Sequence, residues 1–213
     1  MCIRDSDIIS DGDSLKVITE RETREFEFSE IKDLEVNEIH QDDNSGAFAT
    51  IGNSSCAEGH FFEAVNAIGV LQVPAIISIW DEGYGISVSN EYQVTKSDIS
   101  EIIKGFQRDD KGEGFELFKV KGWDYPSLIE AYEKAEKLAR DKHIPSIIHV
   151  IEMTQPTGHS TSGSHERYKS KERLEWEKEF DCIKKYEEWI IKNNIASEEE
   201  LDEIRTEAKE TVK

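Results

Sequence analysis

Two apolar runs, "AIISIW" at residues 75–80 and "SIIHVIEM" at residues 146–153, constrain the fold more than any other feature of the chain. Such runs are typical of strands buried on both faces, which occur in parallel sheets covered by helices. Shorter strand patterns stand at residues 47–52 and 115–120, and segments of helical periodicity separate the four. The alternation predicts an α/β fold with a mainly parallel sheet and helices on both faces.

Helices are expected over residues 57–71, 97–106 and 124–143. Ser97 is a candidate cap for the second helix, and Pro126 suits the first turn of the third. A charged helical tail follows, with patterns at residues 170–194 and 197–210 that predict two antiparallel helices. A capping box formed by Ser197 and Glu200 marks the start of the last helix.

The chain is expected to divide into three parts: a poorly defined lead-in at 1–46, an α/β domain at 47–168 and the helical tail at 169–213. Within the lead-in, apolar and charged residues alternate over 17–31, which is consistent with a strand or hairpin. The first residues, "MCIRDS", are expected to be a non-native leader, and the chain as a whole a fragment.

The formal net charge of −20 argues against nucleic acid or an anionic membrane as the main partner. Three widely spaced cysteines without a CxxC pair disfavour a disulfide framework or a zinc site and fit a cytoplasmic location. Cys56 stands near a helix start, where a thiol pKa can fall, but the favoured interpretation is a small buried residue.

Polar residues follow the first two predicted strands at the edge where parallel strands end. Asn53 comes after the first strand, and Glu82 follows the second, one strand–helix–strand unit later. Oxygen ligands from both, with the backbone carbonyl of Tyr84, could bind Mg²⁺, and the helix after Ser55 would face a phosphate. The alternative is that Asn53 satisfies local backbone and that Asp81 and Glu82 are solvated.

The run "TIGNSSCAEGHFFEAVNAIGVLQVPAIISIWDEGYGISV" resembles the thiamine diphosphate motif of the 2-oxoacid dehydrogenase family. More narrowly, it is similar to the α part of the branched-chain (2-oxoisovalerate) decarboxylating component, in a bacterial form whose α and β parts can be fused. The family's motif opens with Gly-Asp-Gly and closes with Asn-Asn, where this chain has Gly52-Asn53-Ser54 and Asp81-Glu82. The later stretch "GHSTSGSHERYKS" resembles a loop that folds over the cofactor, so the resemblance is expected to cover 47–213.

The resemblance implies roles for individual residues. Asn53, Glu82 and the Tyr84 carbonyl would bind Mg²⁺, with the acidic ligand moved from the first position to the second. His159 would act beside the diphosphate and the reacting substrate, and Ser160 matches a position phosphorylated in some mitochondrial relatives, a regulation not expected here. The remaining predicted cofactor contacts are Gly52, Ser54, Ser55, Trp80 and Tyr84.

The other histidines are read as structural or as surface residues: His40, His60, His143, His149 and His165.

The implied enzyme is an oxidoreductase of branched-chain amino acid catabolism. It decarboxylates a 2-oxoacid such as 3-methyl-2-oxobutanoate and passes the acyl group to a lipoyl arm. The implied partners are a β part, separate or fused, and a lipoyl acyltransferase. Because the β part supplies a glutamate to the cofactor, the fragment alone is expected to be inactive. The alternatives are a pyruvate or acetoin dehydrogenase α part, or a non-catalytic assembly fragment whose tail, 170–213, contacts the β part.

Overall fold

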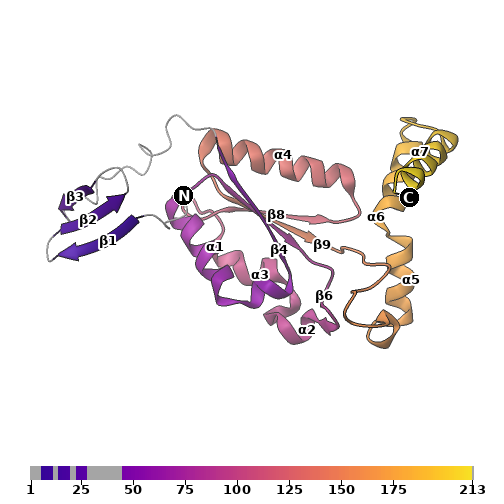
Figure 1. Ribbon diagram of the computed structural model, residues 1–213, viewed down its shortest axis with the longest axis horizontal. Helices are drawn as coiled ribbons and strands as arrows, with labels where there is room; N and C mark the ends of the chain where they lie inside the picture. The colour runs from indigo at the N-terminus through magenta and orange to yellow at the C-terminus, as the bar shows by residue number, and fades with distance from the viewer. Residues whose placement is uncertain (1–5, 12–13, 20–22, 28–44, 213) are drawn as a thin grey trace. The chain divides into compact units, whose positions relative to one another are not determined.

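The computed structural model describes residues 6–11, 14–19, 23–27 and 45–212, and the chain divides into two compact units at residues 43 and 44 (Figure 1). The first unit contains three strands in the order β1-β2-β3, each antiparallel to the next. The alternation over 17–31 was consistent with a strand or a hairpin, and the structure has an antiparallel pairing of the second and third strands, whereas residues 20–22 and 28–31 lie outside the described residues. These strands are β1 (Ser6–Asp11), β2 (Ser14–Thr19) and β3 (Thr23–Glu27).

The second unit is built on a four-stranded sheet in which every neighbouring pair is parallel. The strand order is β4-β5-β9-β8, so the two buried apolar runs lie at the centre of the sheet. The predicted fold class is therefore confirmed. The strands are β4 (Ala47–Gly52), β5 (Ala75–Trp80), β8 (Glu116–Lys121) and β9 (Ser146–Ile151).

Helices cover both faces of this sheet (Figure 1). On one face, Phe61 and Val65 of α1 (Gly59–Leu71) and Ile99 of α3 (Ile99–Ile103) pack against Ile79 and Ile147. On the other face, Ala135 and Ala139 of α4 (Tyr125–Lys142) pack against Ile148 and Val150. Ile147 and Ile148 are adjacent on β9 but point to opposite faces, because side chains alternate along a strand.

The helix starts follow local capping chemistry. Asp124 accepts a hydrogen bond from the Ser127 amide, and Pro126 lies in the first turn of α4 as expected. The cap of α3 was expected at Ser97 but is Asp98, whose carboxylate accepts from the Glu101 amide. The helix is also shorter than expected, because the chain continues from Lys104 to Phe106 as a 3₁₀ turn.

The charged tail contains three helices among the described residues, which corrects the prediction of two. The segment expected to be one helix over 170–194 is divided into α5 (Lys171–Glu179) and α6 (Cys182–Lys192). Asp181 makes the division, because its carboxylate accepts from the Ile183 and Lys184 amides and starts a new helix. The last helix, α7 (Glu198–Thr211), begins with the predicted capping box.

The loop after β5 folds back on itself through a short antiparallel pair and a single-turn helix. These elements are β6 (Tyr84–Gly85), β7 (Val88–Ser89) and α2 (Asn90–Gln93). The turn after β4 is a 3₁₀ helix, Ser54–Ala57. Within the described ranges, no helix is both long enough and apolar enough to cross a membrane.

Candidate functional site

The register of the sheet brings the turns after β4 and β5 together, as the sequence predicted. Gly52 pairs with Trp80, and Trp80 pairs with Val150 on the next strand. The pairing extends one residue further, because the Asn53 amide donates to the Trp80 carbonyl over 3.1 Å. Likewise the Asp81 amide donates to the Val150 carbonyl over 2.8 Å. Asn53 and Asp81 therefore stand at neighbouring strand ends.

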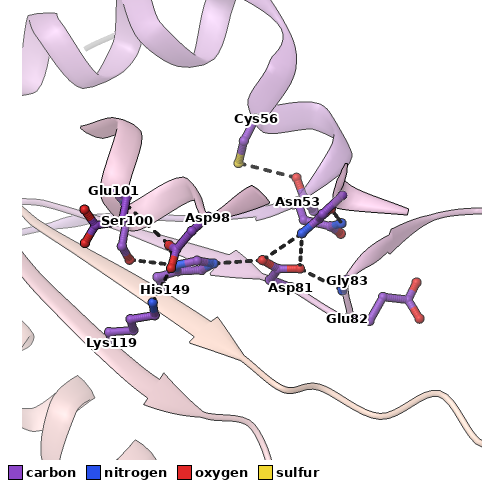
Figure 2. A network of polar contacts seen from close by, with 12 residues as sticks. Asn53, Cys56, Asp81, Glu82, Gly83, Asp98, Ser100, Glu101, Lys119 and His149 are labelled. Atoms are coloured by element: carbon purple, nitrogen blue, oxygen red, sulfur yellow. Dashed lines mark hydrogen bonds and ion pairs between the residues drawn. The ribbon is translucent and has the colours of Figure 1, made fainter. Parts of the chain in front are cut away.

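Side-chain alternation decides which acid faces Asn53. Asp81 continues the face of Ile79, which is the face covered by α1 and α3. Glu82 is the next residue, so its side chain points to the opposite face. Figure 2 shows the Glu82 carboxylate pointing away from both Asn53 and Asp81.

Asn53 and Asp81 are joined through the side chain of Asn90, which returns to the strand ends on α2. The Asn53 Nδ2 group donates to Asn90 Oδ1 over 2.7 Å and to the Tyr84 carbonyl over 2.9 Å. The Asn90 Nδ2 group in turn donates to Asp81 Oδ1 over 2.9 Å. All three side chains are buried. We call the chain Asn53–Asn90–Asp81 the amide relay.

Asp81 is the end of the relay and accepts from two further groups (Figure 2). The Gly83 amide donates to its Oδ1 over 2.7 Å, and His149 Nε2 lies 3.0 Å from its Oδ2. The other ring nitrogen of His149 is 2.7 Å from Ser100 Oγ. His149 is 1% exposed, so the expectation of a structural role fits its position. The carboxylate of Asp81 is thus enclosed by hydrogen-bond partners, as a buried charge requires.

Glu82 belongs to a different set of contacts, centred on a buried ion pair. Its Oε2 lies 4.0 Å from Nζ of Lys169, and its backbone carbonyl accepts from Arg173 over 2.8 Å. Lys169 donates to both carboxylate oxygens of Glu177, and Arg173 donates to one of them. Burial, with a contribution from the charge of Glu177, raises the pKa of Glu82 despite the two nearby cations. We call the set Glu82, Lys169, Arg173 and Glu177 the ion-pair cluster.

The three groups predicted to hold Mg²⁺ do not form a ligand set. Asn53 and the Tyr84 carbonyl are adjacent, but Asn53 presents a donor nitrogen to that carbonyl. Glu82 lies in the ion-pair cluster instead. No cluster of three or more histidine, cysteine or acidic side chains suited to a metal ion occurs in the part of the chain that the structure describes. A divalent cation of this kind needs oxygen lone pairs, so the present arrangement does not fit one.

The residues predicted to contact the diphosphate fit a polar ligand better than the predicted metal ligands fit Mg²⁺. Ser54 Oγ is buried without a hydrogen-bond partner, and a Cβ atom on Gly85 would lie 1.9 Å from it. Gly52 and Ser55 are exposed, and Trp80 is half-exposed with its indole nitrogen bonded to Ser78. Other buried side-chain atoms without a hydrogen-bond partner follow the strand ends in the described residues: Glu82 Oε2, Gln155 Oε1 and His165 Nδ1. Buried polar atoms without a partner are uncommon in folded proteins, and a bound polar ligand is one way to satisfy them.

His159 lies on the loop after β9, half-buried, with its Nδ1 accepting from the Thr161 amide over 3.1 Å. Protonation of His159 would lower the pKa of Glu82, which places the two side chains in one electrostatic environment. Cys56 is buried, as expected, and burial together with the Asp81 charge raises its pKa to about 12. The thiol is therefore protonated at neutral pH and is not a nucleophile.

The domain belongs to the class of parallel α/β folds, in which ligands bind at the carboxyl ends of the strands. Four of the five buried side-chain atoms without a partner among the described residues follow those ends. The chain belongs to the family described as "Dehydrogenase E1 component", whose model matches residues 24–213. The resemblance was expected to start at residue 47, but the match begins at residue 24, inside the lead-in.

Curated relatives include α subunits of two kinds of 2-oxoacid dehydrogenase. The chain is 31% identical over 172 residues to the pyruvate dehydrogenase E1 component subunit alpha of Rickettsia bellii, covering 80% of this chain and 49% of that protein. It is 29% identical over 162 residues to the 2-oxoisovalerate dehydrogenase subunit alpha of Bacillus subtilis, covering 74% and 47%. The chain therefore spans about half the length of these relatives.

Proposed function

We propose that this chain is the cofactor-binding segment of the α part of a 2-oxoacid dehydrogenase and that it forms its site together with a β part. The observation that carries the proposal is the family match, because it spans both the turn after β4 and the His159 loop. The buried Ser54 hydroxyl without a partner supports it, because a diphosphate oxygen would satisfy that group.

The proposed cofactor is thiamine diphosphate, which supplies the carbanion chemistry that decarboxylates 2-oxoacids. Gly52, Ser54 and Ser55 would hold the diphosphate at the turn after β4, with Trp80 beside it. The small residue at Gly85 lets the Tyr84 loop approach the Ser54 hydroxyl closely. His159 would orient the substrate and move a proton at its ring nitrogen. Mg²⁺ enters this proposal only as a variable of the experiment, because its predicted ligands do not converge.

The proposed substrate is a branched-chain 2-oxoacid such as 3-methyl-2-oxobutanoate, with acyl transfer to the lipoyl group of an acyltransferase partner. The similarity to the 2-oxoisovalerate dehydrogenase α subunit of Bacillus subtilis supports this choice. Pyruvate is the second candidate, favoured by the slightly higher identity to the Rickettsia bellii protein. A cytoplasmic location, inferred from the sparse cysteines, remains a prediction.

Calorimetric titration of thiamine diphosphate into the full chain tests the proposal, with and without a β part of the same family, in Mg²⁺ and in EDTA. We expect binding that requires the β part, because the resemblance implies that the β part supplies a glutamate to the cofactor. Ser54→Ala should weaken that binding, whereas Asp141→Asn, an exposed position near the C-terminal end of α4, serves as a control. Absence of binding under all of these conditions would leave the chain as a non-catalytic assembly segment.

A further inference from the structure

We propose that in this chain a side-chain amide takes the place of the divalent cation, so that no Mg²⁺ binds between Asn53 and Tyr84. The inference rests on the proposed function only for its choice of position: this is where the cofactor's metal was predicted. The argument itself uses contacts of the chain alone. It begins from the fixed direction of hydrogen bonding in the amide relay.

The Asp81 carboxylate sets that direction. An ionised carboxylate only accepts hydrogen bonds, and this one accepts from Gly83 and faces His149 and Asn90. Asn90 must therefore turn its NH₂ group toward Asp81, which leaves its Oδ1 facing Asn53. Asn53 must then turn its own NH₂ group toward Asn90. The amide orientations follow from the position of the charge and do not depend on how the two atoms of each amide are distinguished.

The consequence lies at the Tyr84 carbonyl. With Nδ2 of Asn53 held toward Asn90 at 2.7 Å, the second proton of the same nitrogen meets the Tyr84 carbonyl at 2.9 Å. The two amide protons are thus both used, and one of them is directed at the Tyr84 carbonyl, a predicted metal ligand. The amide satisfies the carbonyl in the way that a metal ion would.

Turning Asn53 over to offer Oδ1 to a metal would disrupt the whole relay. Its oxygen would face Asn90 Oδ1, and turning Asn90 as well would set that oxygen against the Asp81 carboxylate. Each step replaces a buried hydrogen bond with a repulsive contact between acceptors. Glu82 offers no substitute as a ligand, because side chains alternate along the strand end and its side chain points toward Lys169 instead. Neutral amides thus join the turn after β4 to the loop after β5 without a cation.

Mn²⁺, followed by its electron paramagnetic resonance signal, is the direct probe of this inference on the full chain. We expect wild-type protein to take up no more Mn²⁺ than Asn53→Ala, because the amide contributes no ligand. Any weak uptake driven by the net charge of −20 should be equal in the two proteins. A saturable site in wild type that Asn53→Ala removes would overturn the inference.

A gain-of-function variant sharpens the test. Asn53→Asp places a carboxylate against two buried oxygens, so its melting temperature should fall in EDTA and recover with Mn²⁺ or Mg²⁺. Wild type and the remote exposed control Asp141→Asn should show equal melting temperatures in EDTA and in metal. If Asn53→Asp fails to fold, the wild-type and Asn53→Ala titrations still decide the question.

Thiamine diphosphate titrations separate this inference from the proposed function. Binding that is equal in Mg²⁺ and in EDTA supports both. Binding that EDTA abolishes supports the proposed function and overturns the inference. Absence of cofactor binding in either buffer, with a β part present, defeats the proposed cofactor role, while absence of a Mn²⁺ site in wild type still supports the inference.

Discussion

The amide relay and the ion-pair cluster begin at adjacent residues, Asp81 and Glu82, yet they satisfy buried polar groups in different ways. The relay has one carboxylate whose oxygens are enclosed by donors, and its other members are neutral amides. The cluster has two carboxylates and two cations, and it still leaves Glu82 Oε2 without a hydrogen-bond partner.

This difference shows what each arrangement can specify. Amides have distinct donor and acceptor ends, so a chain of them transmits the direction set by one charge. Each member of an ion pair is only a donor or only an acceptor, so an ion pair does not pass a direction on to a further group. The relay therefore fixes which atoms face the strand ends. The cluster instead ties the start of α5, through Arg173, to the loop after β5.

Asp81→Ala should have the largest effect on stability of any change at this edge. It leaves the Gly83 amide, the Asn90 amide and the His149 ring without their shared acceptor. We expect the free energy of unfolding to fall by about 3–5 kcal/mol, since each buried group left unsatisfied costs about 1–3 kcal/mol. Urea denaturation measures the change. Glu82→Ala is the neighbouring control, and an equal loss there would show that the relay is no more stabilising than the cluster.

Lys169→Met should have the next largest effect, because it strips one partner from the buried Glu177 carboxylate. Removing one member of a buried pair costs about 3–5 kcal/mol, and the remaining Arg173 should reduce this to roughly 2–3 kcal/mol. The double variant Lys169→Met with Glu177→Met should recover part of the loss, since no buried charge is then left unpaired. Additive losses in urea denaturation would contradict the assigned coupling.

Asp81→Asn tests how much of the relay's contribution to stability depends on the second acceptor oxygen of Asp81. The new amide has nearly the same shape but only one acceptor oxygen, so it cannot accept from Gly83, Asn90 and His149 together. We expect a loss of about 1–3 kcal/mol, smaller than for alanine. Asp98→Asn is the control, because Asp98 is also an acid near His149 but is partly exposed. A larger loss of stability in Asp98→Asn than in Asp81→Asn would show that the more important acid lies outside the relay.

The sheet could be predicted from the sequence because its signals are local. Uninterrupted apolar runs and helical periodicity identify the parallel strands and their crossovers without knowledge of distant contacts. The break at Asp181 was missed because the segment around it contains no glycine or proline and its helical pattern continues across. Only the side-chain contact from Asp181 to the next turn reveals it.

The candidate site was predicted less well, because the alternation of side chains along the strand was not used to choose between Asp81 and Glu82. The sequence brought the loops of Asn53 and Glu82 together correctly, but period-two alternation along Ile77 and Ile79 points to Asp81 as the residue facing Asn53. Counting that period from the strand would have found it. Asn90 carried no such signal, because it reaches the strand ends only after the chain turns back through β6 and β7.

Glu82→Gln should give the smallest effect, and its dependence on pH distinguishes the two acids. The pKa of Glu82 is raised in the folded state, so the folded protein resists its ionisation more than the unfolded chain does. The wild-type protein therefore loses stability as pH rises from the unfolded pKa, near 4.5, through the higher folded pKa. The variant has no carboxyl group at this position and does not lose stability in this way. Its free energy of unfolding should therefore rise relative to that of wild type over this pH interval and remain higher at neutral pH. Because the Glu82 side chain is partly exposed, solvent screening should keep the difference below about 1 kcal/mol. Melting temperatures of the variant and wild type across this pH range measure the effect, and an advantage that shrinks as pH rises would reverse the assigned direction.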